Sequence, residues 1–291
     1  MLAPRSSTWL DILRILLFCS GAERLSVVCD KRPVEVYGMY PSLTPILDSW
    51  LNNLRVVFLD LDDTLCDAEP AWTAGVAAAF DLLLSQRPQI DRQRALDEWQ
   101  QVNERLMVRL NSVKITMSQA RDRRFRLLLK RLDAEDDALA DELNEVLGHV
   151  RLTNMHLFAD AVPVLQALRS SYHVGIVTNG AGDNHDDSQW SVLRHLGLLD
   201  LVDSVWISDE VGFRKPDPRL FEGALEEVGA DPSEVAHVGD SPEADVAGAN
   251  AAGLTSVLLW RQRGEVRVEG PEQRPAIVVR SLSQLPGALD L

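Results

Sequence analysis

The stretch VVFLDLDDTLCD, residues 56–67, places four aspartates directly behind a run of large apolar side chains. Its first four residues form a short, continuous apolar run, which is typical of a strand covered on both faces in a parallel sheet. In open α/β sheets, ligands bind beyond the carboxyl ends of the strands. The stretch therefore predicts a buried strand that delivers carboxylates to a ligand-binding edge.

Short β-branched runs of the same kind recur along the chain, and helical segments lie between most of them. Strands that alternate with helices indicate a sheet with helices packed on both faces. The sequence thus predicts an α/β fold with a doubly wound, mostly parallel, Rossmann-like sheet. We expect its strands at residues 56–60, 174–178, 205–208, 235–239, 256–260 and 276–279.

One long interval, after the first strand, interrupts this alternation. It contains no convincing strand, whereas four of its segments show helical patterns and three of these are rich in helix formers. We therefore expect an all-helical subdomain at residues 69–155, inserted into a core formed by residues 55–68 and 156–291. Residues 1–54 are expected to be an N-terminal appendage, partly helical or disordered, in which SLTPILDSWLNNL (42–54) predicts an amphipathic helix.

The composition limits the partners of the chain. With 291 residues, 46% of them hydrophobic, it can bury a substantial core. Its 29 basic and 44 acidic residues give a net charge of −15, which repels nucleic acid and anionic membranes. The apolar stretch at residues 9–21 is too short to span a bilayer and contains Asp11 and Arg14. Three scattered cysteines favour a reducing compartment, so we expect a cytoplasmic protein that binds neither nucleic acid nor membrane. The sequence gives no indication of oligomeric state.

Polar residues follow three of the predicted strands at the edge where a ligand would bind. They are Asp60, Asp62, Asp63 and Thr64 after the first strand, Thr178, Asn179 and Gly180 after the second, and Asp240, Ser241 and Asp245 after the fourth. Converging carboxylates repel one another, so a cation is expected among them, and oxygen ligands without His or Cys favour Mg²⁺. Mg²⁺ is usually shared with phosphate, for which Thr178, Asn179 and Gly180 offer a hydroxyl and backbone amides. Lys215 offers a fixed positive charge.

Four motifs, in this order, resemble those of the haloacid dehalogenase-like (HAD) superfamily, specifically its phosphatase branch with a helical cap inserted after the first motif. DLDDT (60–64) is similar to the first motif, and VGIVTNG (174–180) is similar to the second. FRKPDP (213–218) is similar to the third, and HVGDSPEAD (237–245) to the fourth. Together the motifs frame residues from about 55 to 285.

The resemblance implies roles for individual residues. Asp60 matches the nucleophile that forms an aspartyl-phosphate, and Asp62 matches the general acid and base. Mg²⁺ would be held by the carboxylates of Asp60 and Asp240 and by the backbone carbonyl of Asp62. Thr178 and Lys215, with Asn179 and Gly180, would hold the phosphoryl oxygens.

Other residues near these motifs are expected to have supporting or structural roles. Asp245 would support Lys215 or a metal-bound water, and Thr64 and Ser241 are further supporting candidates. Asp63 and Asp67 are expected to cap or hydrate the turn. Cys66 is either an oxidation-sensitive thiol or, as we favour, a structural thiol that is partly buried.

The implied function is that of a Mg²⁺-dependent phosphatase acting on a small phosphorylated metabolite of the nucleotide, sugar phosphate or phosphoglycolate type. Dehalogenases of the superfamily lack an acid at the position of Asp62, which makes a carbon–halogen hydrolase the weaker hypothesis. Two alternatives stay open: a phosphotransferase or mutase of the same fold, and a non-catalytic binding module recruited through residues 1–54.

Two further segments carry alternative interpretations. The basic run QARDRRFRLLLKRL (119–132) would either recognise an anion through one or two arginines or form a solvated helix face, which is the favoured interpretation. The loop AGDNHDDSQW (181–190) is longer than in related phosphatases, up to Gln189. It would either form a flexible rim near the entrance or bind a second metal through His185, Asp186 or Asp187.

Overall fold

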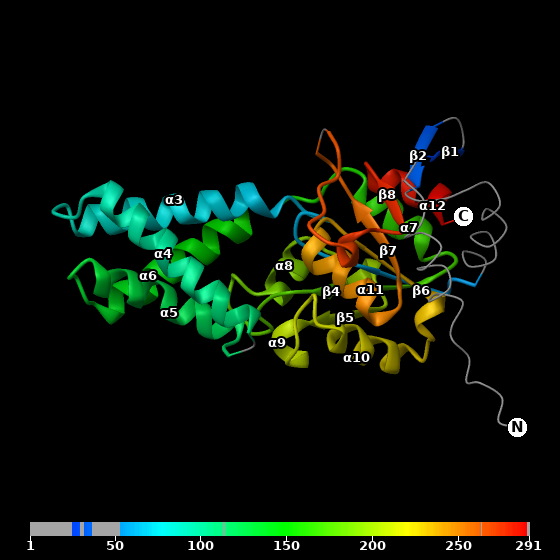
Figure 1. The fold of residues 1–291 in the computed structure, drawn as a ribbon. Coiled ribbons are helices and arrows are strands. Elements are labelled where there is room, and N and C mark those ends of the chain that lie inside the picture. The colour runs from blue at the N-terminus through cyan, green and yellow to red at the C-terminus, as the bar shows by residue number, and fades with distance from the viewer. Residues whose placement is uncertain (1–24, 30–31, 37–52, 113, 263, 290–291) are drawn as a thin grey trace, which may run out of the picture.

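Figure 1 shows the fold in a computed structural model, which describes residues 25–29, 32–36, 53–112, 114–262 and 264–289. The molecule has two visible parts, a sheet flanked by helices and a unit of four long helices that projects from one side of it. The four long helices lie between residues 68 and 153, in the connection between two neighbouring strands.

Six strands form the parallel part of the sheet, in the order β8-β7-β6-β3-β4-β5. They are β3 (Val56–Leu59), β4 (His173–Thr178), β5 (Ser204–Ile207), β6 (Val235–Gly239), β7 (Thr255–Leu259) and β8 (Ile277–Val279). Each coincides with a predicted strand, with its ends shifted by one residue at most. The predicted doubly wound, mostly parallel sheet is therefore confirmed, and β3 lies between β4 and β6.

Two antiparallel strands extend this sheet at its β8 edge. These are β1 (Leu25–Cys29) and β2 (Arg32–Val36), and Glu35 of β2 pairs with Val278 of β8. Neither strand was predicted, because residues 1–54 were expected to be an appendage that is partly helical or disordered. Residues 42–52 of the helix expected at 42–54 lie outside the described part of the chain.

Alternate residues of β3 pack on opposite faces of the sheet, which explains why its whole apolar run is buried. Val57 and Leu59 join the cluster formed with α7, α8 and α12, whereas Val56 and Phe58 join the cluster formed with α10 and α11. The helices of this part are α7 (Ala161–Leu168), α8 (Gln189–His195), α9 (Ser208–Val211), α10 (Pro218–Val228), α11 (Ala247–Ala252) and α12 (Leu285–Ala288). The sheet is thus covered on both faces.

The four long helices have an apolar core of their own. They are α3 (Ala68–Gln86), α4 (Arg92–Asn111), α5 (Met117–Arg131) and α6 (Asp137–Thr153). Trp99 packs in this core, with its ring centroid 4.9 Å from that of Phe125 and 5.6 Å from that of Phe80, to which its ring is nearly perpendicular. We propose that this four-helix unit is the cap predicted at residues 69–155. None of the helices in the described part of the chain is long and apolar enough to cross a membrane.

Candidate active site

Three carboxylates gather at the carboxyl edge of the sheet. Asp60 directly follows β3, Asp240 follows β6, and Asp245 lies in the π-helical turn η4 (Pro242–Val246); one oxygen atom of each lies within 4.8 Å of the others. Burial raises the pKa of Asp60 well above its usual range, although Lys215 opposes the shift. Burial, with a contribution from Asp245, also raises the pKa of Asp240 to about 7. Such crowded, buried oxygen ligands suit a hard divalent cation, which would favour their ionised forms.

Lys215 supplies the positive charge next to these carboxylates. Its ammonium group donates to Oδ1 of Asp60 at 2.5 Å, to Oδ1 of Asp245 at 2.6 Å and to the carbonyl oxygen of Val177 at 2.8 Å. Burial lowers the pKa of Lys215, but the carboxylates of Asp245 and Asp60 outweigh this effect and raise it to about 12. The side chain is only 2% exposed, so it is a fixed cation and not a surface lysine.

Asp245 is fixed by three donors. Besides Lys215, the backbone amide of Ser241 donates to Oδ2 at 3.0 Å, and Nε2 of His237 lies 2.9 Å from Oδ1. Burial raises the pKa of Asp245, but Lys215 and His237 oppose this effect and hold the pKa below its usual range. Burial lowers the pKa of His237, and the contact with Asp245 opposes this effect. Because a carboxylate only accepts hydrogen bonds, Nε2 of His237 is the donor in this contact. The geometry thus gives Asp245 a supporting position behind Lys215.

The residues at the end of β4 and directly after it have different hydrogen-bond partners. Thr178 is buried at the end of the strand, and its hydroxyl oxygen accepts a hydrogen bond from Gln189 at 2.9 Å. Asn179 holds the backbone of Lys215, since Oδ1 accepts from the Lys215 amide at 2.8 Å and Nδ2 donates to the Lys215 carbonyl at 3.0 Å. The amide of Gly180 donates to the hydroxyl of Ser208 at 3.0 Å. In this structure, therefore, Asn179 and Gly180 bond to protein groups.

Asp62 lies on the side of the site that faces the four-helix unit. Its Oδ1 accepts from Nη2 of Arg151 at 3.2 Å, and its Oδ2 accepts from Nε2 of Gln189 at 3.0 Å. Gln189 is buried and bonds to Asp62 and Thr178 through the same amide nitrogen. The Asp62 carboxylate does not belong to the group formed by Asp60, Asp240 and Asp245.

Other residues in the first motif and just after it make structural contacts. Oδ1 of Asp63 accepts from the amides of Ala68 and Glu69 at the start of α3, which confirms the predicted capping role. Cys66 is fully buried, its Sγ lies 3.4 Å from the carbonyl oxygen of Leu61, and burial raises the pKa of the thiol. The burial agrees with the structural interpretation and exceeds the partial burial that was predicted. The Thr64 side chain is buried, and its carbonyl oxygen accepts from Arg261 at 3.1 Å.

Comparison with known proteins decides the family. A model of the haloacid dehalogenase-like hydrolases matches residues 54–253, which is more than half of the chain. The chain belongs to the haloacid dehalogenase-like hydrolases.

Individual members of this hydrolase family resemble the chain over most of their length. It is 29% identical to the glyceraldehyde 3-phosphate phosphatase of Methanothermobacter thermautotrophicus over 236 residues, which are 80% of this chain and 98% of that protein. It is 32% identical to the phosphoserine phosphatase of Thermus thermophilus over 252 residues, with the same coverage. The crystal structure of a 2-haloacid dehalogenase from Pseudomonas syringae matches with a TM-score of 0.66 and 31% identity, over 81% of this chain and 98% of that one.

The four-helix unit of this hydrolase contacts the rest of the chain through oppositely charged groups. Arg151 donates to Asp187 at 2.8 Å as well as to Asp62, and Arg121 forms a bidentate pair with Asp183. Asp209 is the second residue of α9, and its carboxylate accepts from the amides of residues 117 and 118 at the start of α5. In these contacts the four-helix unit supplies the donors and the core supplies the carboxylates.

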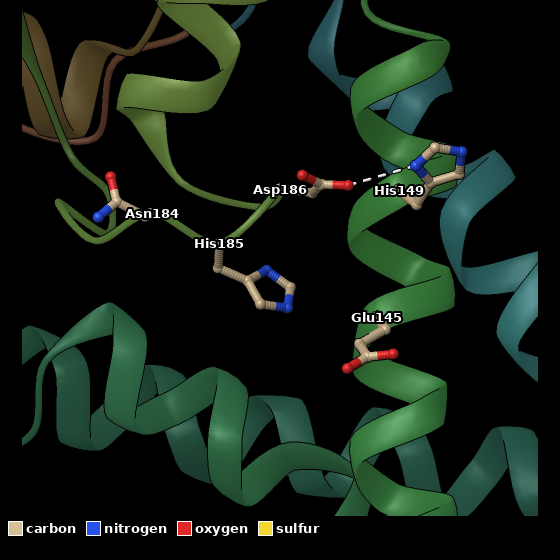
Figure 2. A pocket seen from close by; sticks show the side chains of 5 residues that line it. All are labelled: Glu145, His149, Asn184, His185 and Asp186. Atoms are coloured by element: carbon tan, nitrogen blue, oxygen red, sulfur yellow. Dashed lines mark hydrogen bonds and ion pairs between the residues drawn. The ribbon is translucent and has the colours of Figure 1, made fainter.

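The lengthened loop after Gly180 borders a cavity of about 430 Å³. Figure 2 shows Asn184, His185 and Asp186 of the loop on one side and Glu145 and His149 of α6 on the other. Oδ2 of Asp186 lies 3.2 Å from Nδ1 of His149, and Nδ1 of His185 accepts from the backbone amide of residue 187. The loop thus packs on α6, and its aspartates pair with basic side chains.

Three contact residues were absent from the predicted site: Arg151, Gln189 and His237. His237 carried a signal, because it is a polar residue in an otherwise apolar strand and lies within the fourth motif. Gln189 was predicted only to mark the end of the lengthened loop, with no role in the site. Arg151 carried no signal, since a basic residue in the last turn of a helix is common on protein surfaces.

Proposed function

We propose that this protein is a Mg²⁺-dependent phosphatase that hydrolyses a small phosphorylated metabolite through an aspartyl-phosphate on Asp60. The observation that carries the proposal is the position of Lys215, whose ammonium group joins Asp60 and Asp245 inside the carboxylate cluster. Family membership and two relatives named as phosphatases support it. The cytoplasm stays the predicted location.

The reaction would have two displacement steps at phosphorus. A carboxylate oxygen of Asp60 attacks phosphorus, the bond to the leaving oxygen breaks, and that oxygen takes a proton from Asp62. Asp62 then takes a proton from a water molecule, whose oxygen attacks phosphorus and breaks the bond to Asp60. Inorganic phosphate leaves, and both aspartates return to their starting protonation states.

Fixed donors would hold the negative charge of the transferring group. Lys215 lies against Asp60, and Thr178 lies at the end of the neighbouring strand, so both could reach phosphoryl oxygens bound beyond Asp60. The carboxylates of Asp60 and Asp240, with the backbone carbonyl of Asp62, would hold Mg²⁺, which supplies charge neutralisation when bound. Asp245 and Asn179 would keep Lys215 in place through their hydrogen bonds to it.

The likeness to a 2-haloacid dehalogenase makes carbon–halogen hydrolysis the competing activity. A halide ion leaves without a proton, whereas an alkoxide leaving group needs one near neutral pH. Asp62 supplies a carboxyl group on the cap side of the site, where Arg151 and Gln189 fix it. This residue favours the phosphatase. A halide-release assay with 2-chloropropionate, run beside the phosphate assays, distinguishes the two activities.

The direct test is release of phosphate from p-nitrophenyl phosphate and a panel of phosphate esters, with and without a chelator. We expect turnover by the wild type, loss of turnover in excess chelator, and loss in Asp60→Asn. Asp67→Asn is the matched control, because it removes a carboxylate that lies just after the first motif and is expected only to cap or hydrate the turn. Substantial turnover by Asp60→Asn, or full activity in excess chelator, would reject the mechanism.

A further inference from the structure

Arg124 of α5 is a buried cation with unused donors. It is 7% exposed, and its Nε and Nη1 atoms are buried without a hydrogen-bond partner among the described residues. Its guanidinium lies over the ring of Trp72, 4.8 Å from the centroid, and 5.8 Å from that of Trp99. Stacking offsets part of the cost of burying the charge but leaves these donors unsatisfied.

Two more arginines of the same unit lie close enough to Arg124 to repel it. The positive charges of Arg121 and Arg151 repel the guanidinium of Arg124, whereas the carboxylate of Asp187 attracts it. Asp187 already accepts a hydrogen bond from Arg151 at 2.8 Å, and Arg121 is paired with Asp183. A buried group of three guanidinium ions is costly unless anions lie among them.

This arginine group lies on the leaving-group side of the site. Arg151 touches Asp62, the proposed proton donor, which must contact the leaving oxygen. Lys215 and Asp240 lie with Asp60, where the phosphoryl group would bind. Trp72, which stacks on Arg124, is in the second turn of α3, the helix that directly follows the first motif. A substituent on a leaving group bound at Asp62 would therefore lie near Arg151.

The loop aspartates show what the arginine group binds. Arg121 takes the carboxylate of Asp183 in a bidentate pair, which is the geometry that a planar guanidinium offers to carboxylates and phosphates. Asp183 and Asp187 stand on either side of residues 184–186, which line the 430 Å³ cavity in Figure 2. The cavity is lined by Glu145, His149 and residues 184–186 and by none of the three arginines. An anion in the arginine group would therefore bond to Arg124, whose Nε and Nη1 have no partner among the described residues.

We infer that Arg121, Arg124 and Arg151 form a subsite for a second anionic group on the substrate, with Arg124 as its unpaired donor. The substrate class is then a phosphate ester whose leaving group carries a carboxylate or a second phosphate. This inference rests on the proposed phosphatase function and narrows it. The favoured interpretation of the basic run as a solvated face holds for Arg123 and Lys130, which are exposed, but not for Arg121 and Arg124.

Three esters of similar size test the subsite: glycerol 3-phosphate, 3-phosphoglycerate and 1,3-propanediol bisphosphate. They carry a neutral group, a carboxylate and a second phosphate, respectively. We expect the wild type to hydrolyse at least one of the two anionic esters with kcat/KM at least tenfold above that for glycerol 3-phosphate. The comparison between the two anionic esters identifies which anion the subsite prefers.

The variant Arg124→Met should lower the ratio of kcat/KM for the preferred anionic ester to kcat/KM for glycerol 3-phosphate at least tenfold. Arg123→Met, one residue away on the exposed face of α5, should leave the preference unchanged. Thermal unfolding checks that both variants are folded. If Arg124→Met does not fold, Arg124→Lys keeps the charge, loses the planar fork of donors, and should lower the preference by a smaller factor.

The outcomes separate the subsite from the phosphatase function. Equal kcat/KM values for the three esters, or an equal loss on all three in Arg124→Met, would reject the subsite while the phosphatase function stands. A wild type that releases no phosphate from these esters or from p-nitrophenyl phosphate would reject the phosphatase function and the subsite with it.

Discussion

Arg151 joins the cap to the residue proposed as the proton donor: its Nη2 atom lies 3.2 Å from Oδ1 of Asp62, while its Nη1 atom lies 2.8 Å from Oδ1 of Asp187. Arg151 is in the last turn of α6, and its side chain is 8% exposed. Its two carboxylate partners belong to the first motif and to the loop after Gly180. The orientation of Asp62 therefore depends on how the last cap helix packs on the core.

Replacing Arg151 should weaken proton donation to the leaving group. In Arg151→Met, we expect kcat/KM for ethyl phosphate to fall by at least tenfold more than that for p-nitrophenyl phosphate. The reason is that p-nitrophenolate leaves with little need of a proton, whereas ethoxide needs a correctly placed acid, which contributes about 10²–10⁴-fold. Neither ester has a second anionic group, so the comparison is independent of the proposed subsite.

Folding must be controlled in this test, because removing one partner of a buried ion pair costs about 3–5 kcal/mol. Urea unfolding of Arg151→Met and Arg151→Lys gives the loss of stability of each, and the lysine variant should recover part of the activity on ethyl phosphate. An equal loss on both esters would show that Arg151 acts on stability or binding and does not position Asp62.

Asp240→Asn should weaken metal binding selectively. It replaces one charged ligand of the carboxylate cluster by a neutral one, which reduces the attraction of the site for a divalent cation. We expect the Mg²⁺ concentration for half-maximal activity to rise at least tenfold. The measurement is a titration of activity with MgCl₂ after removal of metal by a chelator, with Asp67→Asn as the control. An unchanged Mg²⁺ requirement would remove Asp240 from the proposed ligand set.

Gly239 tests the support behind Lys215. A Cβ atom at this position would lie 2.1 Å from Cγ of Asp245, so Gly239→Ala must displace the carboxylate that fixes Lys215 and His237. Overpacking of this kind costs about 1–3 kcal/mol, and we expect kcat to fall at least tenfold as well. The readouts are urea unfolding and turnover of p-nitrophenyl phosphate.

Gly223→Ala is the matched control for this substitution. Gly223 lies inside α10, and an added Cβ would meet only the side chain of Val211, at 3.8 Å. Alanine is favoured over glycine in a helix by about 0.5–1 kcal/mol, so this variant should be slightly more stable and fully active. Equal behaviour of the two variants would contradict the account of Asp245.

The sequence predicted the parts of this molecule that depend on local patterns. The apolar run at 56–59 identifies β3, and residues such as Asp60 and Asp240 could be found because they directly follow strands. The fixed cation Lys215 was found through its motif. These positions require only the order of strands in a parallel sheet and the known location of ligands at its carboxyl edge.

The contacts of Asp62 could not be predicted in this way. Arg151 is 89 positions and Gln189 127 positions away from it in the chain, and both contacts depend on the packing of the cap and of a long loop. The same holds for Arg124, whose burial depends on Trp72 and Trp99 of two other helices. The pattern of the basic run at 119–132 did not show which of its arginines are buried.

Asp160 gives a prediction about stability and pH away from the site. Its carboxylate accepts from two nitrogens of Arg261, from the hydroxyl of Ser281 and from the amide of Leu282, and Arg261 in turn donates to the carbonyl oxygen of Thr64. Burial raises the pKa of Asp160, but these donors outweigh burial and hold the pKa below its usual value. The carboxylate thus connects the C-terminal segment to the first motif.

Asp160→Asn should lower the free energy of unfolding by about 1–3 kcal/mol at pH 7, because a charged acceptor of four hydrogen bonds is lost. A lowered folded-state pKa stabilises the protein above the unfolded pKa of about 4, and the stabilisation is lost as the pH falls through the folded value. The difference between wild type and Asp160→Asn should therefore be constant from pH 7 to about 5 and shrink below about 4. Urea unfolding at pH 7, 5 and 3.5 measures it, with Asp97→Asn on the exposed face of α4 as the control. A difference that stays the same at pH 3.5, or grows, would contradict this assignment, because protonation of Asp160 in wild type must bring the two proteins closer together.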